Sequence, residues 1–311
     1  MNVAKLDGLI AATCTPLDQH GDIQVDAIVP YVDFLLESGV RGLYVCGSTG
    51  EGMSLSRAER QVVADRFVRA VDRRVPVIIQ VGHNSLPEAS QLAAHAQQIG
   101  ADAISATCPS YFKTASVSDL VSWMAALATS APDVAFYYYP IPSLTRSTLK
   151  VVEIMRDGGD RIPTLVGLKY TDTKLHEFQQ CVELDQGRFD VVWGCDEMLL
   201  GAFATGARAA IGSTYNIAAP LYDRVIDALQ RNEFVIARQL QSRSIAMIET
   251  LNRYPFHPAL KAVLEMNGLD MGGCRLPLGA LSETDAGQLE CDLRTMGYFQ
   301  WALPESPDTR T

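Results

Sequence analysis

One lysine differs from the other five in this chain because it lies inside an apolar segment. Lys169 occurs in LVGLKYT, residues 165–171. A lysine in apolar surroundings is costly to keep charged, so the neutral amine is favoured. A neutral amine is the nucleophile that attacks a ketone to form an imine, and the protonated imine then withdraws electrons from the adjacent carbon. The alternative role for such a lysine is a structural ion pair.

Polar side chains that could serve imine chemistry stand near the ends of other apolar segments. They are Ser48, Thr49, Tyr111, Tyr139, Asp196, Glu197 and Ser213. If the apolar segments are barrel strands, their carboxyl ends form one catalytic face, and these groups should surround Lys169. The set would combine a nucleophile, a phenol, hydroxyls in a glycine turn and carboxylates.

Each of these signals also has a structural explanation. Tyr137 and Tyr139 share one face of a strand, where a tyrosine is more often core than catalytic. Asp196 and Glu197 suit the first turn of a helix. The segment GSTGE, residues 47–51, could be only a strand–helix turn, although its N–H groups and hydroxyls also suit a bound carboxylate.

The elements that would position these residues alternate along the chain. Short apolar runs typical of buried strands occupy 8–15, 42–47, 75–82, 103–109, 134–140, 165–170, 191–194 and 209–213. Amphipathic stretches that indicate helices occupy 27–38, 56–71, 86–99, 116–131 and 175–184. Ser56 and Glu59 have the spacing of a capping box, and Gly39, Gly100 and Gly206 are candidate C-cap glycines.

Eight strands alternating with helices predict an α/β fold, a closed (β/α)8 TIM barrel, with an open doubly wound sheet as the alternative. Further helices are predicted at 219–229, 234–251 and 258–266. We therefore expect a barrel at 1–218 and C-terminal helices at 219–303, packed on the barrel as a single structural unit. Residues 304–311 are polar and predicted to be a frayed tail.

Composition narrows the functional class. The 311 residues carry a net charge of −10, which disfavours nucleic acid or an anionic membrane as partner. Seven cysteines without a CxxC pair indicate free thiols in a reducing compartment. No signal peptide, membrane span or metal-ligand spacing is evident, so we expect a soluble cytoplasmic protein that needs no metal.

Six motifs extend over nearly the whole chain: GSTGE (47–51), YPIP (139–142), GLK (167–169), GCDE (194–197), GSTYN (212–216) and RLPL (275–278). In these motifs and their order the sequence resembles the class I pyruvate aldolases that include dihydrodipicolinate synthase and N-acetylneuraminate lyase. The family usually has an aromatic pair after the fourth strand, here predicted at 103–109. This chain departs from that pattern, with SYF at 110–112.

The resemblance implies a role for each matching residue. Lys169 forms the imine, Tyr139 moves the proton, and Ser48 and Thr49 hold the substrate carboxylate. Thr49 also relays protons to Tyr139, and Tyr111 completes that relay, partly in the site of a neighbouring subunit. A sugar pocket would be lined by Thr171, Gly194, Asp196, Glu197 and Ser213. The resemblance further implies a homotetramer with no cofactor beyond the imine at Lys169.

Within the family the motifs point to a sugar substrate. YYYPIPSLT, GLKYTDT, GCDE and GSTYN resemble N-acetylneuraminate lyase, which implies pyruvate and an amino-sugar aldehyde as the small-molecule partners. Dihydrodipicolinate synthase usually has an arginine where this chain has Leu144, and Arg146 is out of register. Carboxylates such as Asp196 and Glu197 accept hydrogen bonds from hydroxyls and would repel a second acid. The alternatives are another pyruvate aldolase of the family, acting on a 2-keto-3-deoxy sugar acid or aspartate semialdehyde, and a non-catalytic barrel that only binds an oxo acid.

Overall fold

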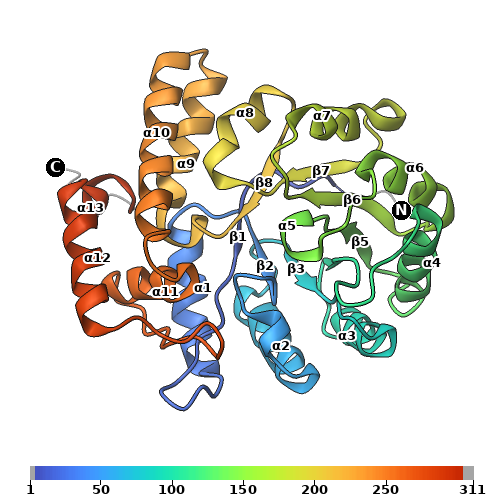
Figure 1. Cartoon of the computed structure of the whole chain (residues 1–311), viewed down its shortest axis with the longest axis horizontal. Helices are drawn as coiled ribbons and strands as arrows, with labels where there is room; N and C mark the ends of the chain where they lie inside the picture. The colour runs from blue at the N-terminus through green and yellow to red at the C-terminus, as the bar shows by residue number, and fades with distance from the viewer. Residues whose placement is uncertain (1–3, 304–311) are drawn as a thin grey trace.

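The computed structural model describes residues 4–303, and its centre is a closed barrel of parallel strands in chain order (Figure 1). The strands are β1 (Gly8–Ala12), β2 (Gly42–Val45), β3 (Val77–Gln80), β4 (Ala103–Ala106), β5 (Ala135–Tyr138), β6 (Leu165–Tyr170), β7 (Asp190–Trp193) and β8 (Ala209–Gly212). Strand β8 pairs back with β1, so the predicted barrel is confirmed and the open sheet is wrong.

Alternation along the strands divides the buried side chains into two cores. One fills the barrel and includes Ile10, Tyr44, Ile78, Tyr137 and Tyr139. The other lies between the outer faces of the strands and the helices. Successive strand residues point to opposite faces. Lys169 is two residues after Gly167, which pairs with the inward Tyr137, so its side chain also enters the barrel.

Helices lie around the barrel (Figure 1), and five of them fall at the predicted amphipathic stretches 27–38, 56–71, 86–99, 116–131 and 175–184. They are α1 (Ile28–Glu37), α2 (Arg57–Val71), α3 (Leu86–Gln98), α4 (Val117–Ala128), α5 (Pro142–Thr145), α6 (Val151–Arg161), α7 (Leu175–Glu183) and α8 (Leu199–Ala204). The predicted capping box of Ser56 and Glu59 starts α2. Gly39, Gly100 and Gly206 each have a positive φ after a helix, as expected for C-cap positions.

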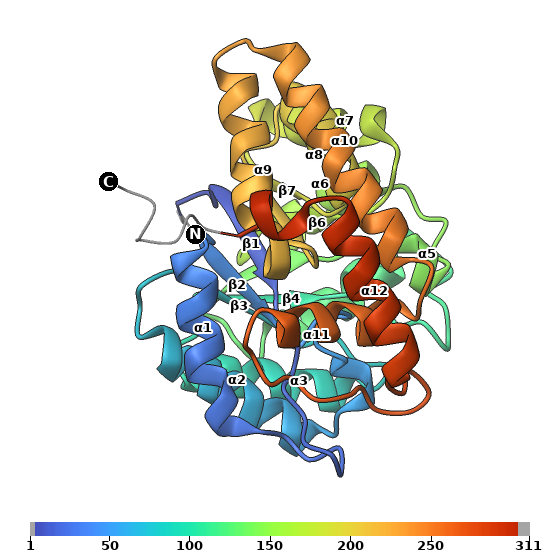
Figure 2. The same ribbon diagram turned by 90° about the vertical axis from the view of Figure 1, so that its left-hand side faces the viewer.

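The remaining helices follow β8 and gather on one side of the barrel (Figures 1 and 2). They are α9 (Tyr215–Gln230), α10 (Phe234–Leu251), α11 (Phe256–Met266), α12 (Glu283–Thr295) and α13 (Tyr298–Trp301). Helix α9 packs on β1 and α10, and α11 and α12 lie against each other. No helix within residues 4–303 is long and apolar enough to cross a membrane.

All seven cysteines are free. Burial raises the pKa of Cys14 and of Cys181 to about 12, so both remain thiols at neutral pH. The predicted tail at 304–311 lies outside the described residues.

Candidate active site

A cavity of about 300 Å³ opens at the carboxyl ends of the barrel strands. It is lined by all the predicted site residues except Tyr111: Ser48, Thr49, Tyr139, Lys169, Thr171, Gly194, Asp196, Glu197 and Ser213. These residues come from the ends of β2, β5, β6, β7 and β8. The barrel therefore brings together groups that are up to 165 positions apart, from Ser48 to Ser213.

Lys169 lies near the end of β6 with only 5% of its surface exposed. Its Nζ is 4.3 Å from the ring centroid of Tyr139 and 4.5 Å from that of Tyr44. Among residues 4–303, no carboxylate lies within ion-pair distance of this amine. The structural ion pair, which was the alternative role for Lys169, is therefore absent among residues 4–303. The amine is left facing the cavity.

The GSTGE turn is held close to the ends of other strands. The hydroxyls of Thr49 and Ser213 hydrogen-bond at 2.7 Å and so join the loops after β2 and β8. Nε2 of His257 lies 3.0 Å from the carbonyl oxygen of Ser48, which can only accept a hydrogen bond. Cys46, just before the turn, and Glu51, its last residue, have positive φ angles of 58° and 56°. This backbone fixes where the Ser48 and Thr49 hydroxyls stand.

The two acidic residues after β7 differ in environment. Asp196 is buried, and its Oδ2 accepts hydrogen bonds from the backbone N–H and the hydroxyl of Thr214 at 2.9 and 2.7 Å. Its Oδ1 has no hydrogen-bond partner within residues 4–303, and burial raises the pKa of this carboxyl. Glu197 is exposed at the cavity. Asp196 therefore orders the loop after β8 with one oxygen, while Glu197 is open to solvent and ligand.

Thr171 and Gly194 meet where β6 and β7 end. A Cβ at Gly194 would clash with the Thr171 hydroxyl, so only glycine allows this approach. The Thr171 hydroxyl is buried and has no hydrogen-bond partner among the residues that the structure describes. A buried polar group without a partner is unusual, and a bound ligand can satisfy it.

Tyr111 is the predicted residue that the structure does not bring to the cavity. Its side chain is 78% exposed on the loop between β4 and α4, and its ring stacks edge-on against Phe112, which is 83% exposed. Within this chain, therefore, Tyr111 cannot complete a relay through Thr49 and Tyr139.

Residues that sequence reasoning missed complete the mouth of the cavity. Ile248, Asn252, Phe256 and His257 come from the end of α10 and the start of α11. Others lie on or beside the strands, namely Ile141, Ile211, Gly212 and Thr214. The C-terminal helices were predicted only to pack on the barrel, and no motif marked 248–257 as part of the site.

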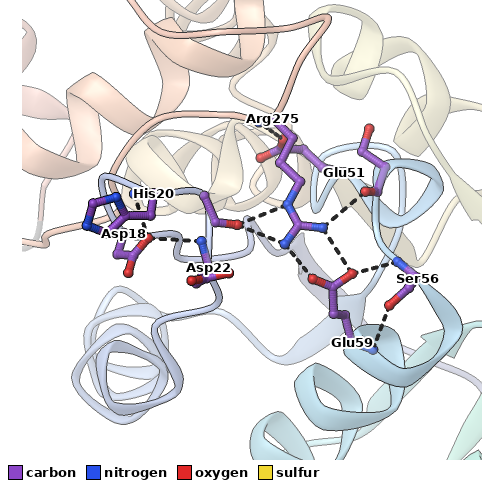
Figure 3. Close-up of polar contacts among 9 residues, drawn as sticks. Asp18, His20, Asp22, Glu51, Ser56, Glu59 and Arg275 are labelled. Atoms are coloured by element: carbon purple, nitrogen blue, oxygen red, sulfur yellow. Dashed lines mark hydrogen bonds and ion pairs between the residues drawn. The ribbon is translucent and has the colours of Figure 1, made fainter.

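The RLPL motif, which had no catalytic role, is connected to the GSTGE turn. The backbone N–H of Arg275 donates to Oε2 of Glu51 at 2.8 Å (Figure 3). Its guanidinium makes a two-pronged contact with Glu59, at 2.5 and 3.0 Å, and also reaches the carbonyl of Gly21. On the other side of Glu51, Lys261 of α11 forms an ion pair at 2.9 Å. The C-terminal segment thus anchors the end of the turn.

Glu59 should give the protein a pH-dependent part of its stability. Hydrogen bonding to Arg275 lowers the pKa of Glu59 from 4.5 to about 2. Because the folded-state pKa is depressed, the stabilisation is fully present above about pH 4.5 and is lost as the pH falls towards 2. We expect the difference in unfolding free energy between wild type and Glu59→Gln, measured in urea, to shrink as the pH falls through that window. Glu153→Gln, at an exposed pair with Lys150, is the control. A difference that stays constant from pH 6 to pH 3 would contradict this account.

Within residues 4–303, no three His, Cys, Asp or Glu side chains are grouped to hold a metal ion. The groups that face the cavity are instead an unpaired lysine, a phenol, hydroxyls and carboxylates.

A barrel with an unpaired lysine, a phenol and a hydroxyl turn at its catalytic face defines a class I aldolase. The chain belongs to the dihydrodipicolinate synthetase family, whose family model matches residues 5–296. It is 37% identical over 302 residues to N-acetylneuraminate lyase of Rattus norvegicus, covering 96% of this chain and 94% of that protein.

Solved structures agree with this assignment. N-acetylneuraminate lyase of Proteus mirabilis superposes with a TM-score of 0.93 at 34% identity, covering 95% of this chain and 100% of that one. A catalytic lysine mutant of the Ruminococcus gnavus sialic acid aldolase superposes with a TM-score of 0.90 at 25% identity, covering 96% and 98%.

Proposed function

We propose that this protein is an N-acetylneuraminate lyase, which reversibly cleaves N-acetylneuraminate to N-acetylmannosamine and pyruvate. The observation that supports this most directly is the buried, unpaired Lys169 in one cavity with Tyr139, Thr49 and Glu197. The similarity in sequence and structure to sialic acid lyases favours the same substrate.

The reaction begins at Lys169. The neutral amine adds to the C2 ketone of the open-chain sugar acid, Tyr139 gives its phenol proton to the departing hydroxide, water leaves, and a protonated imine forms. The Tyr139 phenolate then takes the proton from the C4 hydroxyl while the C3–C4 bond breaks. The electron pair of that bond moves toward the iminium, which gives an enamine and releases N-acetylmannosamine as the aldehyde. Protonation of the enamine at C3 and hydrolysis of the imine release pyruvate and restore Lys169.

The other cavity residues bind and orient the substrate. The Ser48 and Thr49 hydroxyls and the N–H groups of their turn donate hydrogen bonds to the carboxylate next to C2. Thr49 also relays protons to Tyr139. The sugar hydroxyls are bound by Thr171, Asp196, Glu197 and Ser213, with Gly194 providing the space beside Thr171. No cofactor takes part in these steps.

The runner-up is a family member that acts on another keto acid, such as a 2-keto-3-deoxy sugar acid. The third candidate is a barrel that binds an oxo acid without turnover. Leu144 and Arg146 are both exposed and neither lines the cavity, and no other described residue of its lining carries a guanidinium to bind the second acid group of a dicarboxylic product. This disfavours aspartate semialdehyde as the substrate.

The role of Tyr111 requires a second copy of the chain. We propose that the protein is a cytoplasmic homotetramer in which Tyr111 enters the relay of a neighbouring subunit. The exposed Tyr111 and Phe112 rings support this, because large apolar side chains that adjoin on a surface favour burial in an interface. A monomer in light scattering would exclude that role.

A substrate panel tests the proposed function. We expect pyruvate release, coupled to lactate dehydrogenase, to be fastest with N-acetylneuraminate and much slower with 2-keto-3-deoxygluconate. Aspartate semialdehyde with pyruvate should give no condensation product. Preference for 2-keto-3-deoxygluconate would favour the runner-up, and no turnover with any substrate would favour the binding protein.

A further inference from the structure

Tyr44 stands beside the reactive amine although no motif of the sequence marked it. It lies in β2, points into the barrel and is 1% exposed. The Nζ of Lys169 lies 4.5 Å from its ring centroid, and the Tyr139 ring is on another side of the same amine. The rings of Tyr44 and Tyr139 are nearly perpendicular, at 81°, with centroids 5.7 Å apart. Lys169 Nζ therefore sits in a corner formed by two aromatic faces.

The ring of Tyr44 is fixed in this orientation from two directions. Its hydroxyl hydrogen-bonds to Oγ of Ser105 on β4 at 3.1 Å. On another side lies Gly47, the first residue of the GSTGE turn, where a Cβ would come within 2.7 Å of the ring. Glycine at this position lets the turn and the ring pack together.

Tyr44 and Tyr139 differ in what their hydroxyls can do. The Tyr44 hydroxyl is engaged with Ser105 in the barrel, whereas Tyr139 lines the cavity. Burial raises the pKa of Tyr44 well above its ordinary value, so its phenol remains protonated and does not act as a base. What Tyr44 presents to the amine is its ring face.

We propose that Tyr44 is a further catalytic residue, whose ring face, together with that of Tyr139, stabilises the positive charge of the protonated imine at Lys169. The inference rests on the proposed aldolase function. The form of the amine that attacks a ketone is neutral, whereas the protonated imine is positive, and this charge stands on a side chain that is only 5% exposed. An aromatic face within 6 Å attracts a cation, most strongly where the cation is desolvated. Tyr44 forms no covalent bond and transfers no proton.

The size of the effect follows from the same interaction. A desolvated cation–π contact corresponds to a factor on the order of 5 to 30 in an equilibrium constant. Losing the Tyr44 face should therefore lower the equilibrium constant for imine formation with pyruvate by that factor, even though Lys169 and the carboxylate-binding hydroxyls are intact.

The test measures imine formation at Lys169 with pyruvate. Purified full-length protein is equilibrated with a series of pyruvate concentrations and treated with borohydride, and the trapped fraction is read by mass spectrometry. Tyr44→Phe is the reference variant, because it retains the ring and lacks the hydroxyl. Relative to it, Tyr44→Leu should need about 5 to 30 times more pyruvate for half-maximal trapping.

A second series separates electrostatics from packing. Mono-, di- and trifluorophenylalanine at position 44 keep nearly the same shape while progressively weakening the negative face of the ring. We expect half-maximal trapping to require more pyruvate with each fluorine. The same analogues at Phe67, a buried core residue packed on Tyr31, are the control and should leave trapping unchanged.

Two results would overturn the inference. One is a trapping curve for Tyr44→Leu that matches Tyr44→Phe, and the other is a fluorinated series without a trend. If Tyr44→Leu does not fold, the fluorinated series decides alone. Failure of the proposed aldolase function is distinguishable, because wild type itself would then fail to be trapped at Lys169.

Discussion

The Lys261→Met variant is expected to unfold with a free energy about 3–5 kcal/mol lower than that of wild type. The ion pair of Lys261 with Glu51 is almost fully buried, with side-chain exposures of 2% and 0%. Removing the ammonium leaves the Glu51 carboxylate without its cation in a medium that solvates charge poorly. The amine also donates to the carbonyl of Gly273 at 2.6 Å, and that bond is lost as well. Urea denaturation monitored by circular dichroism measures the change.

Two further variants make this result specific. Lys150→Met, at an exposed pair with Glu153, is the matched control and should cost less than about 1 kcal/mol. The double variant Glu51→Gln, Lys261→Met removes the orphaned charge and should recover part of the lost stability. A cost for Lys261→Met no larger than that of Lys150→Met would show that the buried pair does not anchor the GSTGE turn.

The Tyr139→Phe variant is expected to lower kcat for cleavage of N-acetylneuraminate by about 10² to 10⁴, the usual contribution of a positioned general base. The ring of the variant still faces Lys169, so imine formation with pyruvate should persist while bond cleavage slows. Steady-state kinetics and borohydride trapping on the same preparation measure the two steps separately.

Tyr137→Phe provides the comparison, because Tyr137 lies in β5 two residues before Tyr139. The hydroxyl of Tyr137 donates to Asp190 at 2.7 Å and lies away from the cavity. This variant should lose stability while kcat remains close to that of wild type. Equal losses of kcat in the two variants would mean that Tyr139 acts through packing and not through its phenol.

The strands were predictable because each one is buried on both faces and so forms a continuous apolar run. The run at Leu165–Tyr170 coincides with β6. Others extend past the strand ends, because residues such as Cys46, Val81 and Cys108 are buried in the loops that follow. Burial, which the sequence pattern detects, therefore continues beyond the ladder hydrogen bonds that define a strand.

Some helices escaped prediction for identifiable reasons. Helix α6 contains Gly158 and Gly159, which disfavour a helix but allow close packing against Leu165 and Phe189. Helix α12 buries only Leu289 and Leu293, so its sequence looks like a polar loop.

Helix α9 was predicted to begin at residue 219 but begins earlier, at Tyr215. Its backbone is non-helical at Ala218, just before Pro220, so a kink interrupts the regular pattern there. The first turn of α9 was therefore not recognised as helix.

The site could be predicted to the extent that it lies at strand ends. The sequence identifies the strands at whose carboxyl ends Lys169, Tyr139 and Asp196 lie. Closure of the barrel then brings these three residues together. Tyr44 and His257 could not be found in this way. Tyr44 is one more apolar residue of an inward strand face, and His257 comes from a helix whose approach to the GSTGE turn depends on tertiary packing.

The central claim is that Lys169 forms an imine with pyruvate. Wild-type protein incubated with pyruvate and borohydride should gain the mass of one reduced pyruvyl group per chain, and peptide mapping should place it on Lys169. Lys261, the other buried lysine, should remain unmodified because it is paired with Glu51. A protein that gains no mass, or that carries the adduct on another lysine while Lys169 is unmodified, would contradict the account.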